Sequence, residues 1–146
     1  MQTKGTAMDG YAFEDLVVGQ TARVAKTITE ADILLFAAVS TDTNPVHLDA
    51  EAAAASVFKE RVAHGMLSAG LISAVLGTRL PGAGTIYLAQ TLRFRAPVKI
   101  GDTVTAEAEV TALDPDRKRA TLRTTCFVKG KPVIEGEATV MPRSRV

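Results

Sequence analysis

Apolar and polar residues alternate along the last third of the chain with the two-residue period of a β-strand. In Thr103–Ala112, valine or alanine occupies every even-numbered position. The same alternation runs through residues 85–95, 120–128 and 134–140. Short turn sequences at 114–116 and 129–131 separate the last three of these segments. The pattern predicts an antiparallel meander with one apolar face.

The strand predicted over residues 85–95 has a mixed inner face. That face carries Ile86, Leu88, Gln90, Leu92 and Phe94. Gln90 is polar, and a polar side chain on a buried face needs a hydrogen-bond partner, so we expect it to have one. Residues 96–102 follow and are predicted to form a turn or bulge before the next strand.

A stretch without charge precedes these strands. Residues 65–76 read Gly-Met-Leu-Ser-Ala-Gly-Leu-Ile-Ser-Ala-Val-Leu, and their apolar side chains lie on all sides of a helix. Such a helix is predicted to be buried on every side and to be terminated by Gly77 and Pro81-Gly82. It is too short to span a membrane. Helix and sheet can bury each other if the sheet wraps the helix, which predicts an α+β fold.

The first half of the chain is predicted to contain one further strand and two helices. Residues 21–28 alternate loosely and predict a strand. Thr29 is a typical N-cap for a helix that extends to Val39, with Asp32 at its third position. Asp49 is a second N-cap, before an alanine-rich helix predicted over residues 50–57.

One domain is the simplest organisation for 146 residues. We expect this domain to span residues 11–146. The preceding residues 1–10 are polar and lack the apolar core of a signal peptide, so they are predicted to be a disordered leader or a remnant of cloning. A reducing, cytoplasmic location is therefore the default expectation.

The composition argues against several classes of partner and site. The chain has 17 Lys and Arg against 16 Asp and Glu, a formal net charge of +1, so no bulk field attracts nucleic acid or an anionic membrane. Cys126 is the only cysteine, which excludes an intrachain disulfide and a thiolate zinc cluster. With two histidines in total, we expect no metal site.

Residues 40–66 contain both histidines, His47 and His64, together with Asp42. Pro45 interrupts any helix between Asp42 and His47, so these two side chains belong to one loop and could hold a water molecule as an acid–base pair. Gly65 begins the charge-free helix, where unpaired backbone N–H groups favour negative charge. Taken singly, Asp42 is also typical of a turn, His47 of a surface histidine and Gly65 of tight packing.

Together these residues form a recognisable signature. Asp42-Thr-Asn-Pro-Val-His47 resembles the D-x-N-P-x-H motif of the MaoC-like, (R)-specific enoyl-CoA hydratases. His64-Gly65-Met66 is similar to that family's entry into its central helix. The resemblance extends over residues 11–141 and implies the hot-dog fold, an antiparallel β-sheet wrapped around a central buried α-helix.

The resemblance implies a role for each residue of the motif. Asp42 and His47 are expected to be the catalytic pair, and Gly65 the N–H donor to the thioester oxygen (the oxyanion site). Asn44 is expected to support them by pinning the loop. His64 is expected to have a structural role, ordering the loop before the helix.

Three residues of the predicted helix and sheet complete the expected site. Ser73 matches a family serine that supports the catalytic acid. Leu76 and Gln90 are expected to contact the substrate, with Leu76 limiting the acyl pocket.

The implied activity is hydration of a trans-2-enoyl-CoA to the (R)-3-hydroxyacyl-CoA, and the reverse dehydration. Coenzyme A would be part of the substrate, with no metal or redox cofactor, and the choice between coenzyme A and acyl-carrier protein stays open. The fold implies a homodimer. Two alternatives remain: a hot-dog thioesterase, which the Asn-Pro-x-His pattern disfavours, and a non-catalytic subunit that binds acyl thioesters.

Overall fold

The computed structural model describes residues 10–145, so nearly all of the predicted leader lies outside the described residues. Within this range, five antiparallel strands form one sheet in the order β1-β3-β4-β5-β2. The strands are β1 (Thr21–Thr27), β2 (Ile86–Phe94), β3 (Thr103–Asp114), β4 (Arg119–Val128) and β5 (Lys131–Met141). The helices are the short 3₁₀ helix η1 (Phe13–Asp15), α1 (Glu30–Ser40), α2 (Pro45–Leu48), α3 (Ala50–Ala54) and α4 (Gly65–Thr78).

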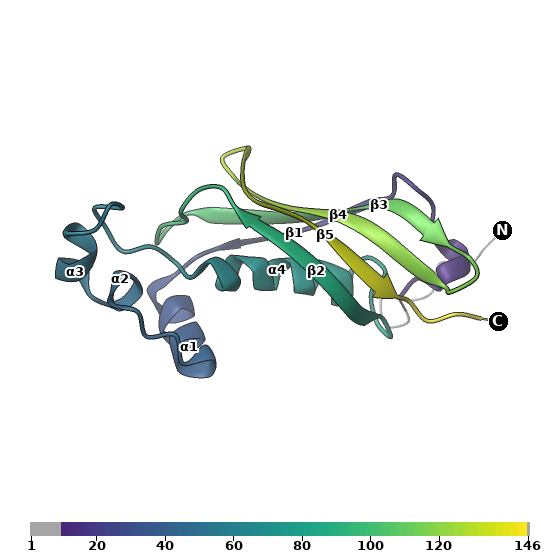
Figure 1. Ribbon diagram of the computed structural model, residues 1–146, viewed down its shortest axis with the longest axis horizontal. Helices are drawn as coiled ribbons and strands as arrows, with labels where there is room; N and C mark the ends of the chain where they lie inside the picture. Colours follow the sequence, from purple (N-terminus) through teal and green to yellow (C-terminus); the bar gives the residue numbers. More distant parts are fainter. Residues whose placement is uncertain (1–9, 146) are drawn as a thin grey trace.

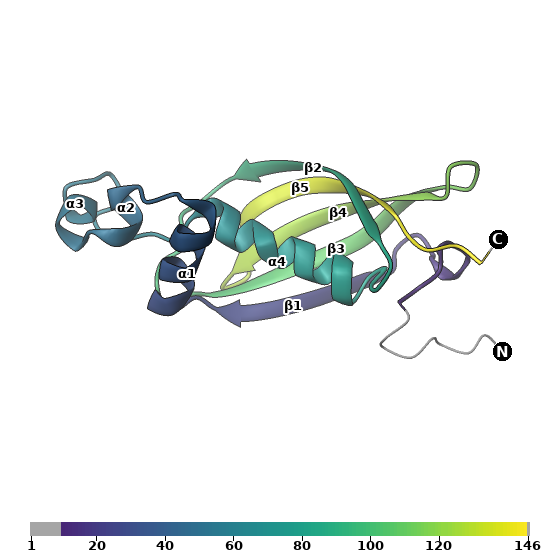
Figure 2. The ribbon, with the colours of Figure 1, turned by 90° about the horizontal axis from the view of Figure 1, so that it is seen from below.

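The predicted relation between the sheet and the charge-free helix is confirmed. Helix α4 lies along one face of the sheet, which curves over it (Figure 1), and the strands pass behind it when the molecule is seen from below (Figure 2). The even-numbered residues 104–110 of β3 are fully buried, and Ile72, Val75 and Leu76 of α4 belong to the same apolar cluster. The core therefore sits between α4 and the inner face of the sheet.

The predicted meander was wrong in its strand order. β2 pairs with β5 at one edge of the sheet, and β1 pairs with β3 at the other. Residues 96–102 therefore connect two strands that are not neighbours, although they contain the expected turn, which the Asp102 N–H closes on the Lys99 carbonyl at 3.0 Å. Alternation shows which residues face the core, but it does not say which strands are paired.

The predicted inner face of β2 was partly wrong because of a β-bulge. The register shifts between Tyr87 and Ala89, so Leu88 has no partner of its own on β5. Directly opposed side chains share a face of the sheet, and Tyr87, not Ile86, lies opposite the buried Val140. From residue 90 onward the predicted face agrees with the register.

The predicted end of α4 is correct to within one residue, but its predicted burial was wrong. The helix ends at Thr78, one residue beyond Gly77, and Gly82 (φ 94°) lies in the turn that follows, as predicted. The helix is not buried on every side: Met66 is 55% exposed, and Gly70, Ser73 and Gly77 are exposed on the same stripe. In the single chain, α4 thus has one buried and one open face.

The predicted N-caps are confirmed. The side-chain oxygen of Thr29 accepts the Asp32 N–H at 3.2 Å, and the Asp32 carboxylate accepts the Thr29 N–H at 2.9 Å, which closes a capping box on α1. Asp49 Oδ1 accepts two N–H groups in the first turn of α3. Helices α1 and α3 therefore begin where their caps were expected.

Helix α3 ends at Ala54 and is shorter than the predicted 50–57. Ser56 Oγ donates to the Ala53 carbonyl at 2.6 Å and accepts the Phe58 N–H at 3.2 Å. A serine that bonds neighbouring backbone groups in this way competes with the helical hydrogen bonds. This turn replaces the last turn of the predicted helix.

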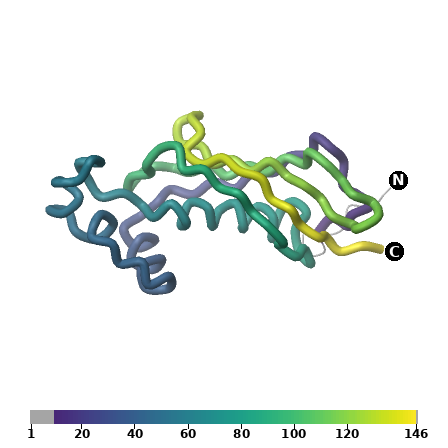
Figure 3. The backbone as a smooth tube through the Cα atoms, viewed as in Figure 1, coloured from purple at the N-terminus to yellow at the C-terminus, as the bar shows by residue number. Residues whose placement is uncertain are grey.

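Helices α1, α2 and α3 project beyond one end of the sheet, and η1 lies at the opposite end (Figure 3). We call residues 30–64 the overhang, and the sheet together with α4 the body. Over residues 10–145, no helix combines the length and apolar character needed to cross a membrane.

Candidate active site

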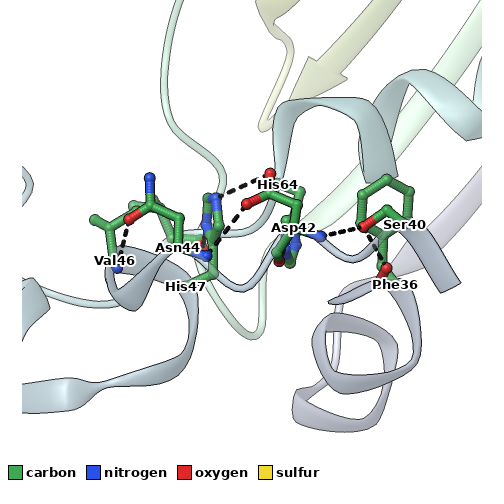
Figure 4. A network of polar contacts seen from close by, with 8 residues as sticks. Phe36, Ser40, Asp42, Asn44, Val46, His47 and His64 are labelled. Atoms are coloured by element: carbon green, nitrogen blue, oxygen red, sulfur yellow. Dashed lines mark hydrogen bonds and ion pairs between the residues drawn. The ribbon is translucent and has the colours of Figure 1, made fainter. Parts of the chain in front are cut away.

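Asp42 follows α1 in a loop that neighbouring backbone groups fix. Its N–H donates to Ser40 Oγ at 3.1 Å, and that hydroxyl donates to the Phe36 carbonyl at 2.6 Å (Figure 4). Thr41 has a left-handed backbone (φ 65°), which turns the chain sharply out of the helix. The carboxylate accepts the Asn44 N–H at 3.2 Å. Asp42 is therefore held in place while its side chain remains half exposed.

Asn44 pins the loop, as its residue type predicts. Its side-chain oxygen accepts the Val46 N–H at 3.2 Å and caps the short helix α2. Pro45 occupies the first helical position, where its missing N–H sacrifices no hydrogen bond. This cap sets the direction in which α2 presents His47.

His47 faces Asp42 across a short gap. Its Nδ1 lies 2.7 Å from the Val62 carbonyl, which only accepts hydrogen bonds, so Nδ1 carries the proton of that bond. The other ring nitrogen, Nε2, lies 4.0 Å from Asp42 Oδ2. This distance is too long for a direct hydrogen bond, but one water molecule could bridge the two atoms.

His64 has the structural position expected of it. It is 2% exposed, and its Nε2 donates to the Asp42 carbonyl at 2.9 Å. Its ring lies between those of Phe36 and His47, with centroid separations of 4.8 Å and 3.9 Å. His64 therefore ties the end of the overhang to the loop that carries Asp42.

Gly65 is the first residue of α4, and the Phe94 side chain occupies the space that a Cβ there would fill. A Cβ built there would lie 2.6 Å from Phe94 Cε1, closer than real Cβ atoms approach. The glycine thus leaves room for the Phe94 ring from β2. The same small residue leaves its backbone N–H open to close approach from the cavity.

A cavity of about 480 Å³ brings most of the predicted residues together. Asp42, Asn44, His47 and Gly65 all line it, at the junction of the overhang and the body. The rest of the wall is mainly apolar and comes from the overhang, α4, the segment after β2, and β5. A concave apolar site with a few convergent polar groups is typical of a small-molecule site.

The other predicted residues lie further along α4. Ser73 and Gln90 line a second cavity of about 430 Å³, and Met66 lines both cavities. Leu76 is 1% exposed and lines neither. In the described part of the chain, no hydrogen bond joins Ser73 to Asp42.

Gln90 has the buried partner that its position on β2 requires. Its side-chain nitrogen donates to Thr124 Oγ1 at 2.8 Å, and Thr124 on β4 is fully buried. The same nitrogen donates to the Thr91 carbonyl at 2.8 Å, and the Tyr87 hydroxyl donates to Gln90 Oε1. The bulge that turns Tyr87 inward thus completes a polar network beside the second cavity.

Two residues at the site were missed by the sequence reasoning. Arg61 Nε donates to the His47 carbonyl at 2.7 Å, and its Nη1 pairs with Glu30 at 2.7 Å. Ser68 lines the first cavity from the buried face of α4. Ser68 had a signal, because it lies one turn after Gly65, whereas nothing local marked Arg61 among its charged neighbours.

The donor atoms of Asp42, His47 and His64 lie within 4.8 Å of one another, which is compatible with a cation. One ring nitrogen of each histidine is already committed to a backbone carbonyl. The absence of a metal was an expectation from the composition, and it stays a prediction.

Comparison with known proteins gives a consistent result. The profile of the MaoC-like domain matches residues 17–136. An (R)-specific enoyl-CoA hydratase of Rhodospirillum rubrum is 64% identical over 135 residues, which is 92% of this chain and 94% of that protein. A 3-hydroxybutyryl-CoA dehydratase of Methylorubrum extorquens is 53% identical over 88% of this chain and 82% of that protein.

Solved structures agree with the sequence relatives. The unliganded R-hydratase PhaJ1 from Pseudomonas aeruginosa superposes with a TM-score of 0.88 at 52% identity, covering 93% of this chain and 88% of that chain. The (R)-hydratase from Aeromonas caviae involved in PHA biosynthesis gives a TM-score of 0.86 at 49% identity, covering 88% and 98%. The family match over residues 17–136 includes the whole overhang and every residue that lines the first cavity.

Proposed function

The chain belongs to the MaoC-like family, and we propose that it is an (R)-specific enoyl-CoA hydratase that adds water to a trans-2-enoyl-CoA and catalyses the reverse dehydration. The observation that carries the proposal is the convergence of Asp42, His47 and the amino end of α4 on one apolar cavity. The names of relatives that match nearly the whole chain support it.

The reacting water would be held between the Asp42 carboxylate and His47 Nε2. Hydration forms a bond from the water oxygen to C3 and places a proton on C2, so the pair must accept one proton and deliver one. The bond from His47 Nδ1 to the Val62 carbonyl keeps Nε2 directed at this position. Asp42 and His47 together would carry out these two proton transfers.

Gly65 would stabilise the charge that builds on the thioester oxygen as C3 is attacked. Its N–H lies at the amino end of the 14-residue helix α4, where the helix dipole favours an anion. A donor of this kind typically contributes about 3 kcal/mol to the transition state.

The acyl chain would pass from the first cavity toward the second. Met66 lines both cavities, and Ser73 and Gln90 line only the second. Leu76, buried behind this wall, would limit its depth. The carrier would be coenzyme A, as the names of the hydratase and dehydratase relatives state for those proteins.

A homodimer would cover the open face of α4 and the edge of the sheet. β2 is an edge strand whose outer side pairs with no other strand in residues 10–145, and Ile86 and Leu88 on it are 51% and 42% exposed. The exposed stripe of α4 that starts at Met66 lies beside this strand, across the second cavity. Sedimentation should give twice the chain mass, and Leu88→Lys should reduce it to the chain mass.

The proposed reaction uses no metal or redox cofactor, and coenzyme A is part of the substrate. Burial raises the pKa of the Cys126 thiol to about 12, so this group is not the nucleophile of an acyl transfer. A single buried free cysteine also fits the proposed cytoplasmic location.

The test is hydration of crotonyl-CoA, followed by the loss of the enoyl-thioester absorbance and by chiral analysis of the product. Asp42→Ala and His47→Ala should each lose roughly 100-fold or more in turnover with unchanged circular dichroism. Glu51→Ala, which removes an exposed acid from the same overhang, is the matched control and should retain activity.

Three results would contradict the proposal. Near-normal hydration by folded Asp42→Ala or His47→Ala would show that these two residues are not the catalytic pair. Release of free thiol from acyl-CoA without hydration would indicate a thioesterase, and binding without either reaction would indicate a non-catalytic acyl-thioester subunit.

A further inference from the structure

Ser68 has a buried hydroxyl whose surroundings leave it without a partner. The residue lies one turn into α4, on its buried face, and is 1% exposed. Among residues 10–145, its Oγ makes no hydrogen bond. An unpaired buried hydroxyl destabilises a folded protein and is uncommon, so this one calls for an explanation.

Other hydroxyls on helices of this chain behave differently. Ser40 on α1 donates to the Phe36 carbonyl at 2.6 Å, and Thr78 at the far end of α4 donates to the Ala74 carbonyl at 2.6 Å. This bond to the carbonyl four residues earlier is the usual solution for a helical serine or threonine. Ser68 does not make the equivalent bond to the His64 carbonyl, which accepts the Leu67 N–H at 3.1 Å.

Among residues 10–145, no acceptor lies within hydrogen-bond reach of the Ser68 hydroxyl. The thiol of Cys126 donates to the Ser68 carbonyl at 3.5 Å, and Ile134, which pairs with Cys126 across the sheet, lines the cavity beside it. Ser68 is one of the residues that line the cavity. A molecule bound in the cavity could therefore bring an acceptor to its hydroxyl.

Ser68 and Gly65 lie on the same side of α4, because residues three apart are neighbours on a helix. Both line the first cavity. The N–H at the start of the helix and the hydroxyl one turn later thus lie along one wall, facing the space that Asp42 and His47 border from the overhang.

We propose that the Ser68 hydroxyl is a second hydrogen-bond donor to the thioester carbonyl oxygen, beside the N–H of Gly65. The inference rests on the proposed hydratase function and adds a residue to it. Bound substrate would supply an acceptor for this hydroxyl, which makes no hydrogen bond within residues 10–145.

This arrangement predicts opposite effects on stability and activity. Ser68→Ala removes an unpaired buried group, so its melting temperature should equal or exceed that of the unchanged protein. The same variant should lose roughly 10-fold to 100-fold in turnover of crotonyl-CoA. Ser68→Thr keeps the hydroxyl and should recover most of that loss. Thr78→Ala, which removes a hydroxyl already bonded within α4, should leave turnover unchanged.

A spectroscopic measurement separates contact with the substrate from a structural role. Butyryl-CoA labelled with ¹³C at its thioester carbonyl has no double bond to hydrate, so its carbonyl stretch can be recorded by infrared difference spectroscopy in the bound state. Binding should lower this frequency in the unchanged protein, and Ser68→Ala should reverse part of the shift. Thr78→Ala should not change it.

The outcomes distinguish this inference from the proposed function. If the unchanged protein does not hydrate crotonyl-CoA, the proposed function fails, and the inference fails with it. If it does, and Ser68→Ala keeps full turnover or the full carbonyl shift, only the inference is overturned. A drop in activity that merely follows a drop in melting temperature also overturns it.

Discussion

The body and the overhang of this protein are held together by different interactions. In the body, the inner residues of β3 and β4 pack against α4 with no exposed surface, and the buried groups are almost all apolar. In the overhang, few apolar side chains are buried, and the chain is held by caps and by bonds from side chains to backbone carbonyls. The proposed catalytic pair lies on the overhang, and the proposed donors to the thioester oxygen lie on the body.

The difference matters because the two kinds of interaction fail in different ways. Apolar packing is distributed over many contacts, so a substitution in the body mainly changes the free energy of unfolding. A directed hydrogen bond in the overhang fixes the position of one group, so its loss mainly changes geometry at the site. We therefore expect substitutions in the body and in the overhang to separate stability from activity.

The largest effect on stability should come from Ile72→Ala in the body. Ile72 is 1% exposed and lies on the face of α4 that packs on the sheet. Its truncation should reduce the free energy of unfolding by about 2–5 kcal/mol, measured by urea titration. Val39→Ala in the overhang, where the side chain is 84% exposed, is the control and should cost less than about 0.5 kcal/mol. Equal losses at the two positions would contradict the contrast between the regions.

Compared with Ile72→Ala, Arg61→Met should affect stability less and turnover more. Arg61 joins the His47 carbonyl to Glu30, so it fixes α2 against α1. We expect turnover of crotonyl-CoA to fall on the order of 10-fold, because a small displacement of a catalytic group is costly. The free energy of unfolding should change by about 1 kcal/mol.

Two further variants, Arg61→Lys and Lys99→Met, test whether the effect depends on the guanidinium group of Arg61. Lysine has a point charge and not the planar fork that reaches two acceptors, so Arg61→Lys should not restore turnover. Lys99→Met removes the cation of a nearby exposed ion pair with Glu60 and should leave turnover unchanged. Full turnover in Arg61→Met would show that the overhang keeps its geometry without this contact.

The same contrast explains what the sequence could predict. Alternation in residues 103–112 and the charge-free run of 65–76 predicted the body, because burial acts on a residue type at a regular period. The caps at Thr29 and Asp49 were also predictable, since each acts within three residues of its own position. In each case the information is local or periodic.

Long-range pairing was not available from the sequence. The order that places β2 beside β5, and the bulge at Leu88, depend on how distant segments meet. The bonds from Arg61 to His47 and Glu30 likewise span 14 and 31 positions. The motif residues Asp42 and His47 could be named in advance, but the groups that hold them could not.

The smallest effect is expected for the cap of α1, the first helix of the overhang. The Thr29 N–H and the Lys26 ammonium, 3.0 Å away, hold the pKa of Asp32 below its usual value. Asp32→Ala should lower the free energy of unfolding by about 1 kcal/mol at pH 7. Because the folded pKa is depressed, this contribution is complete above the unfolded pKa of about 3.9 and is lost as the pH falls through the lower folded value.

Urea titrations of the unchanged protein and Asp32→Ala should therefore differ at pH 7 and converge in more acidic solution. Asp32→Asn keeps an acceptor oxygen without the charge and should fall between them at pH 7. A difference between the unchanged protein and Asp32→Ala that does not shrink in acid would mean that the charge of Asp32 contributes nothing to the overhang.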